Sequence, residues 1–542
     1  MRSITPGIVC FMLVTSSISF FVVNSDSTKG TIIYVNDDNT AGPWDGSLDH
    51  PYRLIQEGIN SAQEGDRIYV FTGTYHENLV IGKNRIQLVG EDQGTTIIQN
   101  PGTLVTITAH NVTMESFSMC DASTYGLYVV NTQDVTIRDC TIQNCYMFGV
   151  YVKNSSRCVL VDVCSHHNHR YGVYVWKSRD CTLTRCTSYD NDNQNYHDHG
   201  FVLFDVQRVT ITECTSYNNY YGFYLDYSDN CSMSRCVAYG NAGYGIHFYD
   251  TDDTVASDCE THDNLGFGFF LELSDYCSIM NSQAYRTNTG ILLYHSTNDT
   301  IVNNTVHNNS WAGIQIRDLS NDNVVFGCTV HHNREGVMVF GSIHNLVYHN
   351  NIFLNMENGY DDCLNTWNLS YPDGGNYWGD YTGDDTDEDG IGDTSYTVGG
   401  AGSYDFYPFM EQNRWVNIAP QRPERPEGSS MGRTNTEYWF HTVTMDREND
   451  PVYYQWSWGD GTTSDWVGPY NSDFDVSLSH EWTQLGFYQI KVKAKDNRDQ
   501  ESEWSESLLF NINGFEPQNI VIDSKNPETP IQNPGGPPRD PR

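Results

Sequence analysis

The sequence predicts an all-β protein: a right-handed parallel β-helix solenoid followed by a second, smaller β-sandwich. The first observation is a glycine followed by alternating aliphatic and aromatic residues, which recurs ten times between Thr124 and Phe340 at a mean spacing of about 23 residues. The second is that cysteine and asparagine return at the same period within these repeats. The third is a Pro-rich stretch after the repeats, beyond which a different strand pattern begins.

The repeated glycine defines one rung of the solenoid, the stretch of chain that makes one turn. It stands at positions 126, 149, 172, 200, 222, 245, 268, 290, 313 and 336, and only the step from 172 to 200 departs from the period, at 28 residues. Alternation of side chains divides each rung into three strands, which in one rung begin at Val135, Cys140 and Gly149. Stacked rungs bury a continuous core, so a chain of 542 residues needs no single large globular interior.

The charge balance excludes several classes of partner. The formal net charge is −39 and the pI about 4.5, which argues against nucleic acid and anionic membrane surfaces. A bare polyanionic polysaccharide would be repelled unless a cation bridges the two. Two classes of partner remain: a neutral polysaccharide or surface glycan, and proteins of the cell envelope.

Residues 7–23 form an apolar run behind Arg2, which predicts an export signal over residues 1–25. The alternative, an uncleaved N-terminal membrane anchor, stays open because the run is not followed by a clean small-x-small cleavage site. No later stretch is apolar enough to span a bilayer. The protein is therefore expected in the extracellular space or at the cell surface.

The solenoid and its two caps are expected over residues 31–410. Leu54 to Ala62 has apolar residues at helical spacing and predicts a short helix that covers the open N-terminal end. The aromatic, Gly- and Asp-rich segment after Asn355 lacks the glycine repeat and predicts the C-terminal cap. The segments that follow are a linker (411–430), a β-sandwich (431–513) and a disordered Pro-rich tail (514–542).

Seven cysteines are assigned to one position of the repeat, where Ser282 stands in one further rung. They are Cys140, Cys164, Cys186, Cys214, Cys236, Cys259 and Cys328. Neighbouring rungs lie about 4.8 Å apart, but stacked parallel Cβ vectors do not favour the torsion of a disulfide, which is near 90°. We therefore expect free thiols that pack as small core residues.

Asparagine recurs between the second and third strands of the rungs. It stands at Asn168, Asn191, Asn241, Asn264 and Asn333. Because asparagine tolerates left-handed turns and its amide can both donate and accept, these residues predict a hydrogen-bonded ladder from rung to rung.

Specific segments resemble known families. The opening IIYVNDDNTAGPWDGSLDHPYRLIQEGI, the closing GNYWGDYTGDDTDEDGIGD and the repeats between them resemble the pectin-lyase-like right-handed β-helix family, with its carbohydrate-binding and sugar-hydrolase group and the NosD-type periplasmic copper-associated proteins. Trp456-Ser-Trp-Gly-Asp460-Gly-Thr, His480-Glu-Trp and the strand from Gly486 to Asp496 resemble a PKD (polycystic kidney disease) domain, an immunoglobulin-like sandwich. Both resemblances imply an extracellular or cell-surface protein, and neither implies one reaction, because the β-helix fold hosts lyases, hydrolases, epimerases and inert scaffolds.

A candidate metal site lies in the expected C-terminal cap. Its ligands would be Asp385, Asp387, Asp389, the Ile391 carbonyl and Asp393. Alternating aspartates can surround one hard cation, and Gly390 permits the sharp turn between them. We expect calcium as a structural ion, and the alternative is a solvated acidic turn.

Aromatic residues recur at two outward positions of the rungs. The candidate carbohydrate-binding residues are Tyr151, Tyr174, Tyr189, Tyr217, Tyr224 and Tyr239. They could form a platform for sugar rings, with Asp226, Asp250, Glu272 and Asp318 at its edge to accept hydroxyl hydrogen bonds. The alternative is that the rings stack on one another and stabilise the sheets without a ligand.

The 28-residue rung carries the candidate catalytic residues Asp190, Asp192, His197, Asp198 and His199, placed directly before Gly200. Imidazoles beside carboxylates could act as acid and base or hold a transition metal. The alternative is a surface insertion with incidental histidines.

Taken together, these features predict an exported cell-surface protein that binds glycans or mediates surface interactions. A polysaccharide lyase, epimerase or hydrolase with its site near residues 190–199 is the alternative from the enzyme class, and non-enzymatic binding is preferred because the rungs lack a compact pair of catalytic carboxylates. A structural surface-layer component is the third interpretation.

Overall fold

The computed structural model describes residues 30–191, 198–448 and 450–513. The chain forms two compact units, Met1–Trp415 and Val416–Arg542. The predicted export signal and the predicted tail both lie outside the described residues. Within them, no helix has the length and apolar composition needed to cross a membrane.

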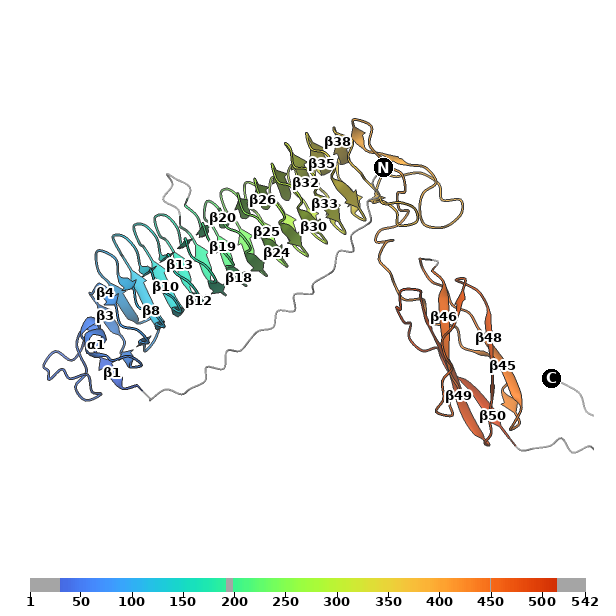
Figure 1. Cartoon of the computed structure of the whole chain (residues 1–542), viewed down its shortest axis with the longest axis horizontal. Coiled ribbons are helices and arrows are strands. Elements are labelled where there is room, and N and C mark those ends of the chain that lie inside the picture. The colour runs from blue at the N-terminus through green and yellow to red at the C-terminus, as the bar shows by residue number, and fades with distance from the viewer. Residues whose placement is uncertain (1–29, 192–197, 449, 514–542) are drawn as a thin grey trace, which may run out of the picture. The chain divides into compact units, whose positions relative to one another are not determined.

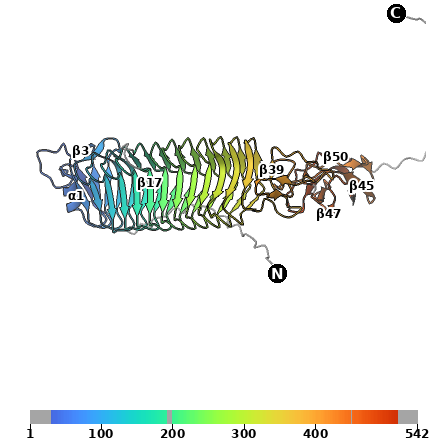
Figure 2. The same cartoon turned by 90° about the horizontal axis from the view of Figure 1, so that it is seen from above.

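The first unit is a parallel β-helix whose rungs stack along one axis (Figures 1 and 2). Sheet B, formed by the strands that follow the repeated glycines, has 14 strands in sequence order. They are β4 (Leu79–Ile81), β7 (Val105–Ile107), β9 (Leu127–Val130), β11 (Val150–Lys153), β14 (Val173–Trp176), β17 (Phe201–Phe204), β20 (Phe223–Asp226), β23 (Ile246–Tyr249), β26 (Phe269–Glu272), β29 (Ile291–Tyr294), β32 (Ala312–Arg317), β35 (Glu335–Phe340), β38 (Glu357–Asp361) and β41 (Gly399–Gly400).

Sheet A, which has 26 strands, consists of two parallel ribbons that are joined where β8 and β10 run through both. The first ribbon contains β1 (Ile32–Val35), β2 (Arg67–Val70), β5 (Gln87–Gly90), β8 (Thr113–Cys120), β10 (Thr136–Gln143), β12 (Val159–Val161), β15 (Thr182–Thr184), β18 (Thr210–Thr212), β21 (Ser232–Ser234), β24 (Val255–Ser257), β27 (Ser278–Met280), β30 (Thr300–Val302), β33 (Val324–Phe326) and β36 (Leu346–Tyr348).

The second ribbon of sheet A begins after two intervening residues in most rungs. It contains β3 (Gly73–Tyr75), β6 (Thr96–Gln99), β13 (Cys164–His166), β16 (Thr187–Tyr189), β19 (Thr215–Tyr217), β22 (Val237–Tyr239), β25 (Glu260–His262), β28 (Gln283–Tyr285), β31 (Thr305–His307), β34 (Thr329–His331), β37 (Asn351–Phe353) and β39 (Tyr377–Trp378), and it shares β8 and β10 with the first. The first residue between the ribbons, such as Asp162 or Asp258, has φ near that of a left-handed turn (52° and 54°). Aspartate and asparagine adopt this conformation more readily than aliphatic residues do, which favours them at the bend.

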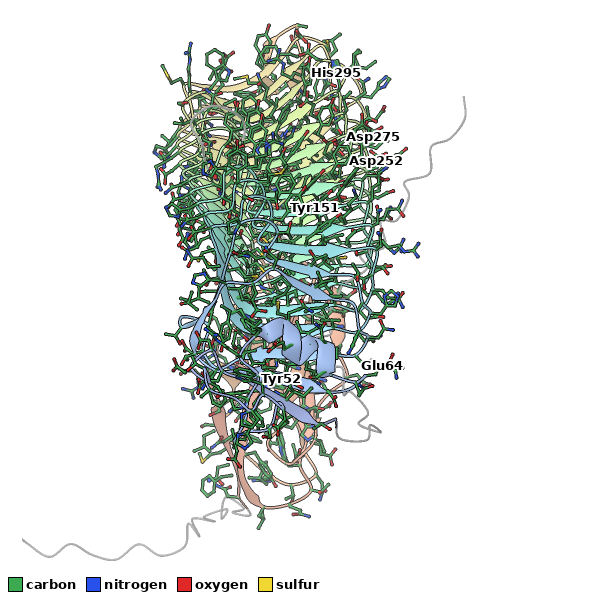
Figure 3. All side chains as sticks on the ribbon, turned by 90° about the vertical axis from the view of Figure 1, so that its left-hand side faces the viewer. Tyr52, Glu64, Tyr151, Asp252, Asp275 and His295 are labelled. Carbon is green, nitrogen blue, oxygen red and sulfur yellow. The ribbon has the colours of Figure 1, made fainter. Side chains whose placement is uncertain are left out.

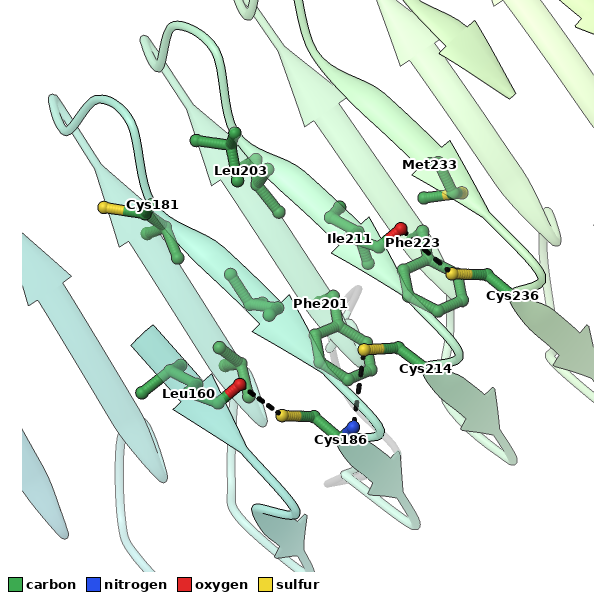
Figure 4. Close-up of a cluster of buried hydrophobic side chains, with 14 of the residues drawn as sticks. Leu160, Cys181, Cys186, Phe201, Leu203, Ile211, Cys214, Phe223, Met233 and Cys236 are labelled. Carbon is green, nitrogen blue, oxygen red and sulfur yellow. Dashed lines mark hydrogen bonds between the residues drawn. The ribbon is translucent and has the colours of Figure 1, made fainter. Parts of the chain in front are cut away.

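Eleven buried cysteines line the interior of the β-helix, and Figure 4 shows four of them. Cys186, Cys214 and Cys236 lie on successive rungs, and the register of the strands that follow them pairs Thr187 with Thr215. None of the described cysteines forms a disulfide. The assignment of Cys164 to this column is wrong by one residue, because Thr141 pairs with Cys164 and the inward position of that rung is therefore Val163.

The predicted asparagine ladder is confirmed. The Asn168 amide donates to Asn191 Oδ1 at 3.0 Å, and the Asn241 amide donates to Asn264 Oδ1 at 2.9 Å. The ladder also contains Asn219, which the sequence pattern did not reveal because it follows the long rung. Each buried amide satisfies backbone groups of the turns, so the ladder fixes the spacing of the rungs.

The N-terminal cap is the short helix α1 (Ile55–Ser61), which lies across the end of the stack (Figure 3). The Glu77 carboxylate accepts hydrogen bonds from the first helical backbone groups, those of Ile55 at 2.7 Å and Gln56 at 3.0 Å. A carboxylate there satisfies amides that no helical carbonyl can reach. Gly58 allows close packing, since a Cβ at this position would lie 2.9 Å from Val35.

The C-terminal cap closes the other end with two fully buried tryptophans, Trp367 and Trp378. The Trp367 indole donates to Asp361 at 3.0 Å and the Trp378 indole donates to Asp405 at 2.8 Å. The small sheet of β40 (Tyr396–Thr397) and β42 (Tyr404–Asp405) completes the cap. Tryptophan therefore fills the volume that a further rung would occupy, while the carboxylates satisfy its polar atoms.

The second unit is a β-sandwich (Figure 1). One sheet contains β43 (Glu427–Gly428), β45 (Glu437–Thr442) and β48 (Val476–Glu481), and the other contains β44 (Met431–Gly432), β50 (Leu508–Ile512), β49 (Gly486–Lys495), β46 (Val452–Ser457) and β47 (Val467–Tyr470). Trp456, Trp482 and Phe440 are buried between the sheets.

Candidate functional site

The outer face of sheet B carries bulky side chains in three parallel columns. The entry column, which directly precedes the repeated glycine, contains Tyr125, Phe148, Tyr171, His199, Tyr221, Tyr244 and Phe267. The middle column, two residues after the glycine, contains Tyr128, Tyr151, Tyr174, Val202, Tyr224, His247 and Phe270. The exit column, four residues after the glycine, includes Trp176, Asp226 and Glu272.

The rings of these columns cover one another. Tyr151 and Tyr174 have centroids 5.1 Å apart and planes 4° apart, and His199 and Tyr221 lie at 4.7 Å and 4°. Tyr151 is only 5% exposed although it points away from the core. The stacked rings therefore present their edges and hydroxyl groups to solvent rather than their faces.

Asp226 is a buried carboxyl within this aromatic surface. It is 8% exposed, and its Oδ2 accepts a hydrogen bond from the Tyr224 hydroxyl at 3.0 Å. Its Oδ1 is buried and has no hydrogen-bond partner among the described residues. Burial raises the pKa of Asp226 to about 6, the Tyr224 hydrogen bond opposes this rise, and the Asp250 charge adds to it.

His247 lies beside Tyr224 on the next rung, with ring centroids 5.1 Å apart. Its Nε2 lies 3.1 Å from Glu272 Oε2, which assigns the ring proton of the neutral imidazole to Nε2. Its Nδ1 is buried and has no hydrogen-bond partner within the described part of the chain. Burial lowers the pKa of His247 and Glu272 opposes this, so the imidazole is neutral at physiological pH and Nδ1 is an unfilled acceptor.

Trp176 contributes a donor to the same face. Its indole Nε1 is buried and has no acceptor among the residues that the structure describes. Its ring stacks near Tyr174 at 6.4 Å, and the Lys153 ammonium lies 4.4 Å from the ring centroid. We call Trp176, Tyr224, Asp226, His247 and Glu272 the sheet B polar site. Trp176 lies two rungs before Asp226, with Phe204 between them, so the site extends along several rungs and offers two unfilled acceptors and one unfilled donor.

The long rung places two of its candidate residues at this face. His199 occupies the entry column between Tyr171 at 5.3 Å and Tyr221 at 4.7 Å, and both His199 and Asp198 are 5% exposed. Burial raises the pKa of Tyr171, the Arg170 charge opposes this rise, and the charges of Asp198 and Asp226 add to it. His199 of the long rung therefore lies beside the candidate residue Tyr224 on sheet B, with ring centroids 5.4 Å apart.

Asp190 is separated from His199 and lies in the turn after β16, where the Asn218 amide donates to its carboxylate at 3.1 Å. Asp192 and His197 lie outside the described residues. The five candidate catalytic residues are thus not gathered in one described cluster.

The six candidate tyrosines divide between two faces. Tyr151, Tyr174 and Tyr224 lie on sheet B. The other three belong to a stack on the second ribbon of sheet A: His166, Tyr189, Tyr217, Tyr239, His262, Tyr285, His307, His331 and Phe353. Centroid distances in this stack are 4.7 to 5.1 Å, so each ring covers the faces of its neighbours.

Comparisons with known proteins agree with this architecture. Residues 74–223 match the family model described as right handed beta helix region, and residues 190–383 match the model described as periplasmic copper-binding protein (NosD). Residues 425–507 match the PKD domain model. The chain is a right-handed parallel β-helix protein with a C-terminal PKD domain. A comparison of this β-helix–PKD protein with curated proteins finds no match.

Solved structures resemble each unit. The PKD domain of M14-like peptidase from Thermoplasmatales archaeon SCGC AB-540-F20 is 37% identical over 18% of this chain and 98% of that chain, with a TM-score of 0.17. The Azotobacter vinelandii mannuronan C-5 epimerase AlgE4 A-module is 16% identical over 58% of this chain and 99% of that chain, with a TM-score of 0.40. Tailspike protein 2 from Escherichia coli O157:H7 bacteriophage CAB120 is 13% identical over 88% of this chain and 68% of that chain, with a TM-score of 0.38.

The acidic turn of the β-helix–PKD protein brings three of its candidate ligands together. Carboxylate oxygens of Asp385, Asp387 and Asp389 lie within 4.8 Å of one another. The neighbouring negative charge of Asp389 raises the pKa of Asp387. Asp393 instead accepts hydrogen bonds from the Thr386 backbone and hydroxyl at 2.9 and 2.5 Å, which lower its pKa.

The donor set of this turn distinguishes between metals. It is the one group of three or more acidic, histidine or cysteine side chains with metal-site spacing in the described part of the chain, and it offers only oxygen. Oxygen ligands suit hard cations such as calcium, whereas copper favours imidazole and sulfur. The copper named for the NosD family therefore has no matching group of three ligands among the described residues.

The burial of His247 and its pairing with Glu272 were not apparent from the sequence, where His247 stood among outward tyrosines. The residues of the entry column could have indicated this burial from the sequence. An aromatic ring or imidazole directly before each repeated glycine indicates that the outer face of sheet B is covered by a second layer of rings.

Proposed function

We propose that this protein binds a neutral glycan on the outer face of sheet B, at the sheet B polar site. The observation that carries the proposal is the group of unfilled buried polar atoms there: Asp226 Oδ1, His247 Nδ1 and Trp176 Nε1. An unpaired buried polar group costs about 1–3 kcal/mol, a cost that a bound ligand can remove. Sugar hydroxyls supply both donors and acceptors, and so complement two acceptors and one donor at once.

The aromatic rings support binding through their edges. Because stacking occupies their faces, they cannot act as open platforms for sugar rings, and the Tyr174 and Tyr224 hydroxyls are the groups that can reach a ligand. The surrounding rings exclude water from Asp226 and His247, which strengthens hydrogen bonds made there.

Charge favours a neutral glycan over an acidic one. Asp226 and Glu272 belong to the site, and Asp250 lies close enough to raise the pKa of Asp226. The chain as a whole carries a net charge of −39. A polyuronate would meet these carboxylates without a compensating basic cluster, so its binding would require a bridging cation.

Affinity electrophoresis in gels that contain neutral polysaccharides, supported by a glycan array, tests the proposal. Tyr224→Phe removes the hydroxyl that orients Asp226, and we expect it to weaken binding about fivefold, the equivalent of one hydrogen bond of about 1 kcal/mol. Asp226→Asn and His247→Phe should weaken binding as well.

The matched control for Tyr224→Phe is Tyr285→Phe. It also removes a phenol hydroxyl that is bonded to a carboxylate, that of Glu260, but on the second ribbon of sheet A. We expect this variant to bind as wild type does. Equal loss in both variants, or no retardation of wild type by any neutral glycan, would refute the site.

Acid–base turnover of the bound glycan is a second candidate function, as in a lyase, epimerase or hydrolase. It is favoured by two groups on neighbouring rungs: Asp226, whose pKa burial raises to about 6, and His247, whose pKa burial lowers, so that its neutral imidazole can accept a proton. Release of reducing ends or unsaturated sugars from a polysaccharide panel tests it. Turnover should follow a pH profile with a pKa near that of Asp226, and Asp226→Asn should abolish it; a panel that is bound but never converted would leave the protein a binding protein.

We also propose that the protein acts outside the cytoplasm, at the cell surface or in the extracellular space, and that calcium stabilises its C-terminal cap through Asp385, Asp387 and Asp389. Convergence of the three carboxylates supports the calcium site. Calcium should raise the melting temperature of wild type and leave that of Asp387→Ala unchanged. Equal melting temperatures of wild type with calcium and with a chelator would contradict the assignment.

A further inference from the structure

The turns that lead from sheet B to the first ribbon of sheet A carry basic residues on earlier rungs and acidic residues on later ones. Two outward positions of these turns form columns from rung to rung. The first column contains Lys177, Asp205, Tyr227 and Asp250, and the second contains Arg179, Gln207, Asp229 and Asp252. In each column a basic residue is followed three rungs later by an aspartate. We call these two columns the turn edge.

From this arrangement we propose that the turn edge binds the turn edge of a second copy of this chain in an antiparallel dimer. A two-fold axis perpendicular to the stack, midway between the rungs of β17 and β20, brings Lys177 opposite Asp250 of the second copy. The same axis brings Arg179 opposite Asp252 of the second copy. One axis serves both pairs because each pair spans three rungs, about 14 Å. Each contact then occurs twice, as in every isologous interface.

The residues at the centre of the turn edge also match. The two-fold axis places the Tyr227 hydroxyl opposite the Asp205 carboxylate. It places the Gln207 amide opposite the Asp229 carboxylate. Phenol and amide groups donate hydrogen bonds that carboxylates accept. A parallel dimer would instead set each charged residue against its own counterpart, and like charges repel.

The basic side chains of the turn edge are held only loosely. Lys177 Nζ lies 3.9 Å from the Asp205 carboxylate, beyond hydrogen-bond distance, and Arg179 Nε lies 4.0 Å from that of Asp180. Asp180 is instead bonded by Arg208, whose nitrogens lie 2.7 and 3.1 Å from its two oxygens. The Lys177 and Arg179 side chains are 52% and 67% exposed. Both can therefore turn toward a carboxylate of a second copy.

A recess lies between these two basic side chains. Its volume is about 450 Å³, and its lining includes Asn154, Ser156, Lys177, Arg179 and Gln207. Amide, hydroxyl and cationic groups can all donate hydrogen bonds to a carboxylate. Asp205 is the one acidic residue of the lining, and the Tyr227 hydroxyl of the second copy would face it. The recess therefore fits the aspartates from the other half of the turn edge.

The acidic half of the turn edge lacks a base of its own. Over the rungs from β20 to β26 the chain has a single basic residue, Arg235, and its guanidinium pairs with Glu213 at 3.0 Å. Asp252 lies on one edge of the stack beside Asp275 of the next rung (Figure 3). Burial raises the pKa of Asp252, a backbone hydrogen bond opposes this rise, and the charges of three neighbouring aspartates add to it. Basic side chains of a second copy would relieve this repulsion.

The contact is small, so its strength depends on charge. The turn edge spans four rungs, about 20 Å, and two copies joined there bury less than the roughly 1,200 Å² of a stable complex. The net charge of −39 repels the copies at a distance, but at about 0.15 M salt this repulsion is screened beyond about 8 Å. We therefore expect a weak dimer that forms at micromolar or higher concentrations and dissociates as the salt concentration rises.

Exchanging the charges of Lys177 and Asp250 tests the dimer. The two residues occupy one column with the same left-handed backbone, at φ of 49° and 46°, so each position can accept the other side chain. In sedimentation equilibrium of the full chain at about 0.1 M salt, Lys177→Asp and Asp250→Lys should each weaken self-association at least about tenfold, because like charges then face each other. A mixture of the two variants should associate as wild type does, since the heterodimer restores both ion pairs.

Lys491→Asp is the matched control, because it makes the same substitution at a lysine of β49 in the PKD domain, and it should leave self-association unchanged. A carbodiimide, which joins an amine to a carboxylate in contact with it, should cross-link Lys177 of one copy to Asp250 of the other. A wild-type protein that stays monomeric up to about 0.2 mM, or equal loss in Lys177→Asp and Lys491→Asp, would overturn the proposal. Loss of association that the mixture does not restore would assign the basic half to another anionic partner and would overturn the dimer as well.

Discussion

Replacing Asp299 by asparagine should stabilise the β-helix at neutral pH. Asp299 is fully buried in a column of the first ribbon of sheet A, between Cys277 and Asn323 of the neighbouring rungs. Its Oδ1 accepts from the Cys277 backbone at 2.8 Å, whereas its Oδ2 has no partner among the described residues. On the next rung, the Asn323 amide donates to the Ser296 carbonyl at 3.0 Å. An asparagine at 299 would direct an amide toward the equivalent carbonyl, that of Ser274.

The size of this stabilisation follows from the raised pKa of Asp299, because its carboxyl must take up a proton when the protein folds at neutral pH. Burial raises its pKa from 3.8 to about 9, and the nearby charges of Asp275 and Asp252 add to this, although the Cys277 hydrogen bond opposes it. A carboxyl whose folded pKa is raised contributes its full stability below pH 3.8, and this stability is lost as pH rises toward the folded value. At about 1.36 kcal/mol for each pH unit, the cost near pH 7.5 is about 5 kcal/mol. Asparagine avoids that cost at every pH.

Thermal unfolding of both proteins by circular dichroism, from about pH 4 to pH 9, measures the effect. The difference in melting temperature should be small at pH 4 and grow with pH. Asp275→Asn is the matched control. Asparagine keeps an oxygen that can accept from the Thr297 backbone, as the Asp275 carboxylate does at 2.7 Å, so this substitution should change the melting temperature much less than Asp299→Asn does. A pH-independent difference for Asp299→Asn, or a loss of stability at pH 8, would refute the reasoning.

Three further predictions concern the repeat itself. Asn241→Ala removes buried hydrogen bonds to both neighbouring rungs and should lower the free energy of unfolding by about 2–4 kcal/mol, measured by urea denaturation. Gly222→Ala should also destabilise, because its Cβ would lie 2.5 Å from a backbone carbonyl oxygen, whereas Gly82→Ala meets its nearest atom at 3.8 Å and should be close to neutral in the same assay. Alkylation of the native protein should modify the half-buried Cys363 well before Cys140, because burial raises the pKa of the Cys140 thiol to about 12. Equal rates of alkylation at the two cysteines would contradict a core of buried free thiols.

The period of the sequence predicts the rungs because the same side-chain positions point into the core in every rung. The spacing of the glycines, the division into three strands and the asparagine ladder all follow from side-chain alternation, which local sequence carries. The error at Cys164 shows the limit of residue identity as a guide. A cysteine matched the column by type, but the strand register places Val163 inside and Cys164 outside.

The candidate sites were less predictable because they depend on distances between segments. His199 reaches Tyr221 only because the long rung returns to the same column, and the extra residues conceal this in the sequence. The middle column was expected to face solvent, yet rings at a rung spacing near 5 Å bury one another.

The distribution of unsatisfied groups explains why the proposed glycan site lies on sheet B rather than on sheet A. In a solenoid, stability is close to a sum over rungs and their interfaces, so a few rungs can carry unfavourable groups while the rest hold the fold. The ring stack of sheet A is uniform, and its Tyr285 hydroxyl is bonded to Glu260. On sheet B, Val202 and His247 in the middle column and Asp226 in the exit column stand where neighbouring rungs carry aromatic rings. Asp226 and His247 each have a buried polar atom without a partner among the described residues. Deviations of this kind, from a repeat whose buried polar atoms have hydrogen-bond partners elsewhere, are expected where selection acts on ligand binding rather than on the fold. The opposite behaviour of Tyr224→Phe and Tyr285→Phe in glycan binding is therefore a test of this argument as well as of the site.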